Sequence, residues 1–178
     1  MKRPFVTAEQ LRQIVEQYPT PFHLYDEAGI RANARRLHKA FAWNPRFREY
    51  FAVKATPNPR ILQILQEEGC GVDCATLTEL LLAEAVGFSG EEIMFSANMT
   101  PFEDFSFAHK LGAILNLDDI SDIDYFQHLP HIPELVSCRY NPGGKFAISN
   151  EIMNTPAEAK YGFTREQLTT GYRRLMDL

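Results

Sequence analysis

Tyr50-Phe51-Ala52-Val53-Lys54-Ala55 is an apolar run with a single lysine near its end, and the turn Thr56-Pro57-Asn58-Pro59 follows at once. Such a run predicts a buried strand over residues 50–55 that delivers Lys54 to its carboxyl end. A lysine in that place is usually a solvated charge. The same amine can act as a nucleophile toward an aldehyde if the surrounding fold presents it to one. The residues around this strand must decide between the two interpretations.

The overall composition is that of a water-soluble globular protein. The chain has 178 residues, of which 45% are hydrophobic and 23% charged, and its formal net charge is −5. The negative charge argues against a nucleic-acid partner. We find no stretch long and apolar enough to cross a membrane, and the basic first residues lack the apolar region of a signal peptide. We therefore expect a cytoplasmic protein with neither nucleic acid nor a membrane as a partner.

The cysteines do not indicate a metal site or a disulfide framework. Cys70, Cys74 and Cys138 are an odd number, and their spacing is not that of metal ligands. Cys70 and Cys74 fall in an apolar segment, so we interpret them as small core residues of a reduced protein. No metal is predicted.

From residue 50 onward, apolar runs alternate with amphipathic segments. The predicted strands are 50–55, 71–75, 92–97, 113–117 and 134–140. The predicted helices are 59–68, 76–86, one from Thr100 to about 111, 120–129 and one from Thr164. Upstream, we predict a helix over 7–17, a strand over 22–25 and a helix over 26–43. Residues 141–161 show no regular period, which is typical of a functional or partly disordered loop.

This alternation predicts an α/β fold with a parallel sheet. No Gly-x-Gly-x-x-Gly follows the first strand, so a dinucleotide-binding sheet has little support. A (β/α)8 TIM-type barrel fits better, although it needs eight strands and about 250 residues. We expect residues 1–45 to be N-terminal helices and a strand leading into the barrel. Residues 46–178 would be its first five βα units, leaving the barrel incomplete.

Polar residues stand near the carboxyl ends of the predicted strands, where a barrel places its active site. In chain order they are Lys54, Asp73, Asn98, Asp118 or Asp119, and Arg139. Each has a simpler explanation. The two aspartates can be helix caps, Asn98 can stabilise a turn, and Arg139 can pair with a surface carboxylate. The set is more informative than any member, because every strand places its polar residue at the same end.

Three of these segments resemble the fold-type III decarboxylases that depend on pyridoxal 5'-phosphate (PLP). The matching motifs are Phe51-Ala52-Val53-Lys54-Ala55, Gly71-Val72-Asp73-Cys74-Ala75-Thr76-x-x-Glu79 and Glu92-Ile93-Met94-Phe95-Ser96-Ala97-Asn98. This family includes diaminopimelate, ornithine and arginine decarboxylases and has the alanine racemase-like barrel. Three further segments look most like the diaminopimelate branch: Thr20–Asp26, Arg139–Gly144 and Ala159–Phe163.

The resemblance implies roles for individual residues. Lys54 would bind PLP covalently, Asp73 would lie near the cofactor and the lysine, and Arg139 would help to position the pyridoxal ring or its surroundings. Glu79 would be structural, because Thr76 and Glu79 match a capping box. The lysine amine must be partly neutral to react, so we expect a desolvated site around it.

The resemblance also implies parts that cannot be placed in these 178 residues. Family members carry, further along, a histidine that stacks on the ring, a glycine-rich phosphate loop, an acidic residue facing the pyridine nitrogen and a C-terminal β-domain. The cysteine and tyrosine of that domain belong to the partner subunit's site. The intact parent is thus expected to be a homodimer that forms L-lysine from meso-diaminopimelate, and this chain an inactive N-terminal part without the β-domain.

Departures from the family pattern keep other functions open. Thr56 stands where the family often has asparagine, and Ala159–Gly162 replaces Ser-Lys-Phe-Gly. The alternatives are another PLP-dependent amino-acid decarboxylase, a racemase of the same fold, or a non-catalytic half-barrel that only binds a ligand. An open half-barrel exposes strand edges, so we also expect association into a homo-oligomer.

Overall fold

A sheet of five parallel strands forms the centre of the molecule. The computed structural model describes residues 4–143 and 161–178. The strands are β1 (Tyr50–Ala52), β2 (Gly71–Cys74), β3 (Ile93–Phe95), β4 (Ile114–Leu117) and β5 (Val136–Cys138). Their spatial order is β1-β2-β3-β4-β5, and each strand is parallel to its neighbours. A doubly wound sheet reverses its order at a switch point, whereas this order never reverses. The predicted barrel class is therefore confirmed.

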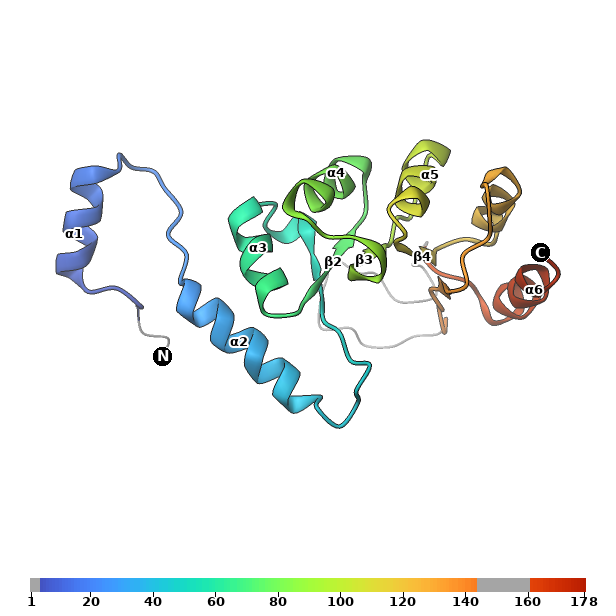
Figure 1. Cartoon of the computed structure of the whole chain (residues 1–178), viewed down its shortest axis with the longest axis horizontal. Coiled ribbons are helices and arrows are strands. Elements are labelled where there is room, and N and C mark those ends of the chain that lie inside the picture. The colour runs from blue at the N-terminus through green and yellow to red at the C-terminus, as the bar shows by residue number, and fades with distance from the viewer. Residues whose placement is uncertain (1–3, 144–160) are drawn as a thin grey trace.

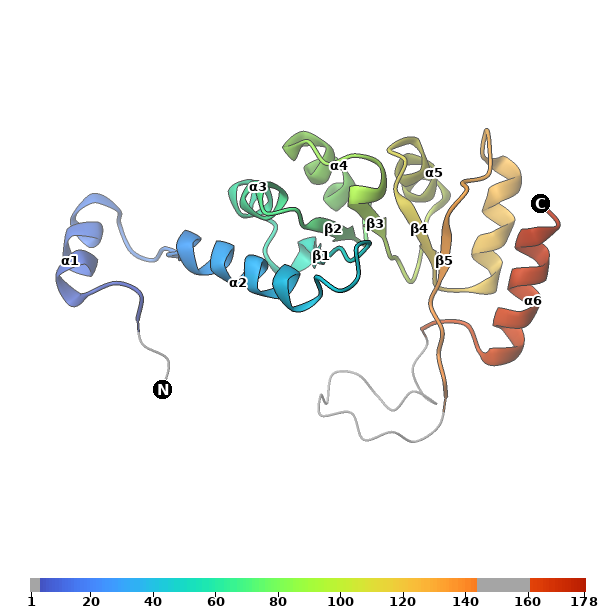
Figure 2. The same ribbon diagram turned by 60° about the horizontal axis from the view of Figure 1, so that its bottom comes forward.

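Helices connect the strands and cover one face of the sheet (Figure 1). The α-helices are α1 (Ala8–Gln17), α2 (Glu27–Ala40), α3 (Pro59–Glu67), α4 (Leu77–Val86), α5 (Phe102–Lys110) and α6 (Arg165–Met176). The described residues also form the 3-10 segments η1 (Val53–Ala55), η2 (Gly90–Glu92) and η3 (Ile120–His128). Helix α1 contains no buried residue and stands apart from the sheet (Figures 1 and 2). Within the described ranges, none of the helices combines the length and apolarity needed to cross a membrane.

The core lies between the sheet and the helices. Strand side chains on this face are buried: Val72, Cys74, Ile93, Phe95, Leu115 and Leu117. The residues between them along each strand are only half-buried, among them Asp73, Met94 and Asn116. Burying a large apolar side chain contributes about 1.5–3 kcal/mol, so the helix-covered face supplies most of the packing energy. The opposite face is left for polar chemistry.

The first strand is shorter than its sequence predicts. Strand β1 ends at Ala52, and Val53–Ala55 form the 3-10 turn η1, so the predicted extent to Ala55 was wrong. Val53 is fully buried, and the amide of Thr56 donates to its carbonyl over 3.1 Å. This inward anchor bends the chain out of the sheet. Lys54 therefore lies on a turn directly after the strand.

Three other expectations need correction. Residues 22–25 form no strand, because nothing in the described part of the chain pairs with them. The helix predicted from Thr100 begins only at Phe102, with Pro101 at the cap position, and the Thr100 carbonyl accepts a hydrogen bond from Tyr125 Oη over 2.8 Å. The predicted helix over 120–129 is the 3-10 segment η3, a distinction that periodicity over nine residues does not make. Residues 144–160, which include most of the segment predicted to be a loop, lie outside the described residues.

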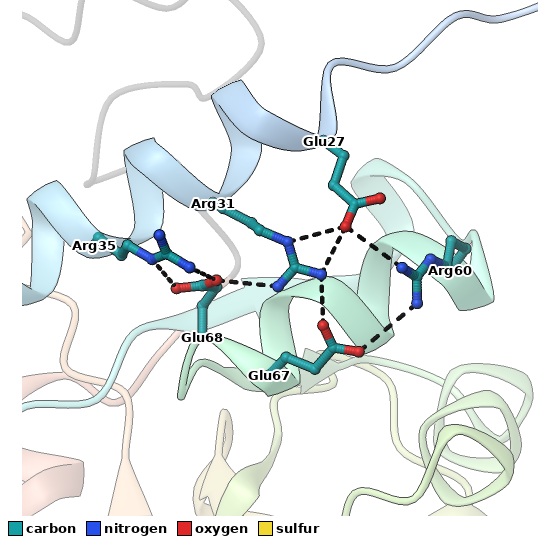
Figure 3. Close-up of polar contacts among 6 residues, drawn as sticks. All are labelled: Glu27, Arg31, Arg35, Arg60, Glu67 and Glu68. Atoms are coloured by element: carbon teal, nitrogen blue, oxygen red, sulfur yellow. Dashed lines mark hydrogen bonds and ion pairs between the residues drawn. The ribbon is translucent and has the colours of Figure 1, made fainter.

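Ion pairs attach α2 to α3 (Figure 3). The carboxylate of Glu68 accepts from Arg35 Nε and Nη2, both over 2.6 Å, and from Arg31 Nη1 over 3.0 Å. Arg31 also reaches Glu27 at 2.7 Å and Glu67 at 2.5 Å. Beneath this surface network, Ala34 of α2 joins a small apolar cluster with residues of α3 and Cys70. Charge pairing and apolar contact together hold α2 to the first βα unit.

The pairing at Glu68 predicts a specific pH dependence of stability. Hydrogen bonds from Arg35 and then Arg31 lower the pKa of Glu68 from its ordinary 4.5 to about 2. Above the ordinary value the carboxylate is charged in both states and the pairing stabilises the fold. As the pH falls from 4.5 toward 2, the unfolded chain binds the proton first, so this contribution is lost. The difference in thermal midpoint between wild type and Glu68→Gln should thus be largest at neutral pH and narrow by about pH 3.

Circular dichroism melts of the two proteins measure this difference. Glu84→Gln, at an exposed position of α4, is the control for a general loss of one carboxylate. A gap that stays equally wide at both pH values would contradict the assigned role of Glu68.

The segment after residue 160 returns to the end of β5. The amide of Phe163 donates to the Arg139 carbonyl over 2.7 Å, and the amide of Asn141 donates to the Phe163 carbonyl over 2.8 Å. Phe163 is fully buried in the main core. Gly162 has φ +84°, and a Cβ there would lie 3.0 Å from the Arg139 carbonyl oxygen. The turn that holds Arg139 therefore requires glycine at position 162.

Replacing this glycine should destabilise the protein. In Gly162→Ala the new Cβ would sit on a left-handed backbone and against the Arg139 carbonyl oxygen, which belongs to the backbone and cannot easily move. We expect a loss of about 2 kcal/mol or more in the free energy of unfolding. Urea unfolding measures the change. Gly69→Ala is the matched control, because Gly69 has φ +81° but nothing within 4 Å of its Cβ position. Equal losses in the two variants would show that the contact with Arg139 contributes nothing.

Candidate cofactor-binding site

The fold gathers the three predicted site residues at the carboxyl ends of the strands. Lys54 lies on η1 directly after β1, Asp73 lies in β2 opposite Ala52 of β1, and Arg139 follows β5. Turn η1 contacts β2, which brings the lysine toward the aspartate. Lys54 is exposed, whereas Asp73 and Arg139 are half-buried. The site is therefore open on the side of the sheet that no strand-connecting helix covers.

Asp73 is the electrostatic centre of this group. Burial raises the pKa of its carboxyl group, and the neighbouring Ser96, Lys54 and Arg139 act in the opposite direction. Its Oδ1 atom is buried and has no hydrogen-bond partner among the described residues. A buried polar atom without a partner costs about 1–3 kcal/mol. The carboxylate thus has accepting capacity that a bound polar group can satisfy.

Arg139 is held in place by a buried acid. Its Nη1 atom lies 2.8 Å from Oδ1 of Asp118, whose side chain is only 4% exposed. The contact is an ion pair whose alignment falls short of a hydrogen bond. Burial raises the pKa of Asp118, while Arg139 and the backbone amide of Gly162 lower it. Arg139 therefore has a buried partner, in place of the surface carboxylate of the simpler explanation.

The structure separates the remaining candidates from this group. Asp119 caps η3 by accepting from the amide of Ser121 over 2.9 Å. Asn98 is exposed in a bend after β3. Glu79 accepts from the amide of Ala75 over 2.8 Å, one residue further back than a capping box requires. Asp119 is the helix cap of its simpler explanation, whereas Glu79 binds the backbone without completing the predicted capping box with Thr76.

Sequence reasoning missed three polar residues on the half-buried face of the sheet. Asn116 Nδ2 donates to Ser96 Oγ over 3.1 Å, and Ser137 Oγ donates to Asn116 Oδ1 over 2.7 Å. We call Ser96, Asn116 and Ser137 the polar row. It crosses the end of β3, β4 and β5 and begins beside Asp73. The signal was available, since Asn116 and Ser137 each interrupt an apolar strand at a position that faces away from the helices.

These groups fit a cofactor that carries an aldehyde and a polar ring. An accessible primary amine can bind the aldehyde, and a carboxylate with a free accepting position and a fixed guanidinium can contact polar ring atoms. One expectation is not met by the described residues: Lys54 is exposed, so they do not supply the desolvated surroundings that its reactivity needs. The described residues therefore fit the reactive, aldehyde-bearing end of the cofactor.

The chain is similar to known proteins over most of its length. Residues 27–178 match the family described as pyridoxal-dependent decarboxylase, pyridoxal binding domain. The chain is 38% identical to Protein TabA of Pseudomonas amygdali pv. tabaci over 94% of its own length and 39% of that protein. It is 29% identical to a diaminopimelate decarboxylase of Methanothermobacter thermautotrophicus, covering 93% of this chain and 39% of that one.

The fold agrees as well. The crystal structure of diaminopimelate decarboxylase from M. jannaschi superposes with a TM-score of 0.82 at 22% identity, over 93% of this chain and 41% of that one. The chain thus spans about two fifths of the length of the curated relatives named above. Its match to the family model covers most of its length. The chain therefore belongs to the pyridoxal-dependent decarboxylases and carries their pyridoxal-binding domain, the part of these proteins that takes the cofactor pyridoxal 5'-phosphate.

Proposed function

We propose that Lys54 is the residue that binds PLP, with Asp73 and Arg139 completing the contacts at its side. The observation that carries this proposal is the convergence of one accessible amine, one under-satisfied carboxylate and one anchored guanidinium on the same end of the sheet. Asp73 attracts both cations, since Lys54 and Arg139 each lower its pKa. A charged Asp73 would keep the Lys54 amine near the strand ends.

The residues divide the work of the reaction. Lys54 would hold the cofactor through its Nζ atom. Arg139, fixed by Asp118, presents the rest of its guanidinium to the open face. When bound, PLP supplies an electron-accepting ring that stabilises the negative charge left by the departing carboxyl group. Nothing in this division requires a metal.

We propose meso-diaminopimelate as the substrate of the intact protein, with L-lysine and CO2 as products. The support is that several relatives are diaminopimelate decarboxylases. A different amino-acid substrate is the second candidate, because the relative with 38% identity is Protein TabA, whose name specifies no reaction. Product analysis after incubating the intact protein with meso-diaminopimelate, lysine, ornithine and arginine separates these possibilities. Release of CO2 from none of them would refute the proposed class of substrates.

We further propose how this chain relates to the intact enzyme. Residues 1–45 lead into the barrel, residues 46–178 supply its first five βα units, and the remainder and the β-domain complete the site. On this view the 178 residues alone are inactive. Strands β1 and β5 each pair on one side only among the described residues, so we propose that the chain associates as a homo-oligomer in the cytoplasm. Light scattering that shows only a 20.4 kDa monomer at high concentration would contradict this association.

Binding of PLP to Lys54 is directly testable. Adding PLP to the purified chain should produce an absorbance band at about 420 nm, and borohydride should then attach the cofactor irreversibly to the protein. Peptide mass spectrometry should locate the label on Lys54. Lys54→Ala should lose both band and label, whereas Lys110→Ala, on the outer helix α5, should keep them. Equal labelling of Lys54→Ala and wild type would refute the assignment.

A further inference from the structure

The polar row has a direction that follows from its hydrogen bonds. Ser137 Oγ donates to Asn116 Oδ1, which fixes the carboxamide so that Nδ2 faces the other way. Asn116 Nδ2 then donates to Ser96 Oγ. A serine hydroxyl has one proton and can accept as well as donate. Because Ser96 already accepts from Asn116, its own proton is left for another acceptor.

The acceptor beside Ser96 is Asp73. Ser96 follows β3, and its backbone amide donates to the Cys74 carbonyl over 2.8 Å, which places it next to the end of β2. In this position Ser96 favours the charged form of the Asp73 carboxyl group. The row therefore ends at a serine that lies beside the Asp73 carboxyl group, which Lys54 also influences.

We propose that Ser96 is a positioning residue for Asp73, and that Asn116 and Ser137 aim its hydroxyl at the carboxylate through a directed chain of hydrogen bonds. The importance of this arrangement for catalysis rests on the proposed role of Asp73 beside Lys54. The hydrogen-bond chain itself does not depend on that role. A neutral Asp73 would attract neither cation. The row thus makes a charge near the cofactor depend on Asn116 and Ser137, which lie two and three strands away from Asp73.

The charged surroundings of Asp73 are consistent with a need for this support. Lys54 on η1 and Arg139 at the end of β5 both lower the pKa of Asp73. Arg139 also forms an ion pair with Asp118. On its own strand the neighbour is Cys74, whose buried thiol has a pKa raised to about 12 and carries no charge. Burial is the largest influence and favours the neutral acid. A fixed neutral donor such as Ser96 opposes it without adding a further charge.

A purely structural role for the row is the competing explanation. Strands β4 and β5 are already joined by backbone pairing from Leu115 to Leu117, so the side-chain bonds are not needed to hold them together. A structural role would affect the free energy of unfolding and leave the protonation of Asp73 unchanged. The pKa of Asp73 is therefore the measurement that distinguishes the two explanations.

The test is a carbon-13 NMR titration of the Asp73 carboxyl group in the full 178-residue chain without PLP, assigned with Asp73→Asn. Ser96→Ala and Ser137→Ala should each raise this pKa, by about one unit for loss of a hydrogen bond to a charged group. Ser137→Thr keeps a hydroxyl donor and should restore the wild-type value. In the double variant, Ser137→Ala should add nothing to Ser96→Ala, because Ser137 acts only through Ser96.

Two results would overturn the proposal: no change in Ser137→Ala, or an equal added shift in the Ser96→Ala background. Ser106→Ala, a half-buried serine of α5 outside the row, is the control and should leave the pKa of Asp73 unchanged. Circular dichroism checks that each variant is folded. The outcome is separate from the cofactor assignment: a shifted Asp73 together with PLP labelling in Lys54→Ala would support the hydrogen-bond chain and refute the proposed cofactor site.

Discussion

Burial of every second side chain of the strands beneath the helices is the constraint on which the rest of the structure depends. Val72, Ile93 and Leu115 occupy this layer and are completely excluded from solvent. Because strand side chains alternate, fixing one set under the helices forces the other set onto the opposite face. The position of Asp73 and of the polar row is a consequence of apolar packing elsewhere.

The opposite face concentrates charges whose separate burial would be costly. Asp73 and Asp118 both have carboxyl groups whose pKa is raised by burial, and Arg139 counteracts this effect at both. One guanidinium thereby couples two strand ends. Gly162 contributes to the same site. Its backbone amide lowers the pKa of Asp118, and its left-handed backbone passes close to the Arg139 carbonyl oxygen. Site electrostatics and backbone geometry are joined at this point.

The sequence was informative wherever a pattern repeated. Five apolar runs with intervening amphipathic segments indicated the parallel sheet, and the register of those runs indicated which ends carry polar residues. The prediction failed where a single contact outweighed local preference. The predicted strand through Ala55 was cut short because Val53 is pulled into the core, and residues 22–25 have strand-like composition but no strand to pair with. Most of the loop predicted over residues 141–161 lies outside the described residues, so that prediction stays open.

By itself the sequence determined the class of fold, the family resemblance and the identity of Lys54, Asp73 and Arg139 as candidates, because these depend on order and spacing along one chain. Tertiary structure alone decided that Asp118, and not Asp119, pairs with Arg139. It alone decided that Ser96, Asn116 and Ser137 form one row. The physical reason is that such contacts join residues about twenty positions apart, and they arise only when the pairing register of neighbouring strands sets those residues side by side.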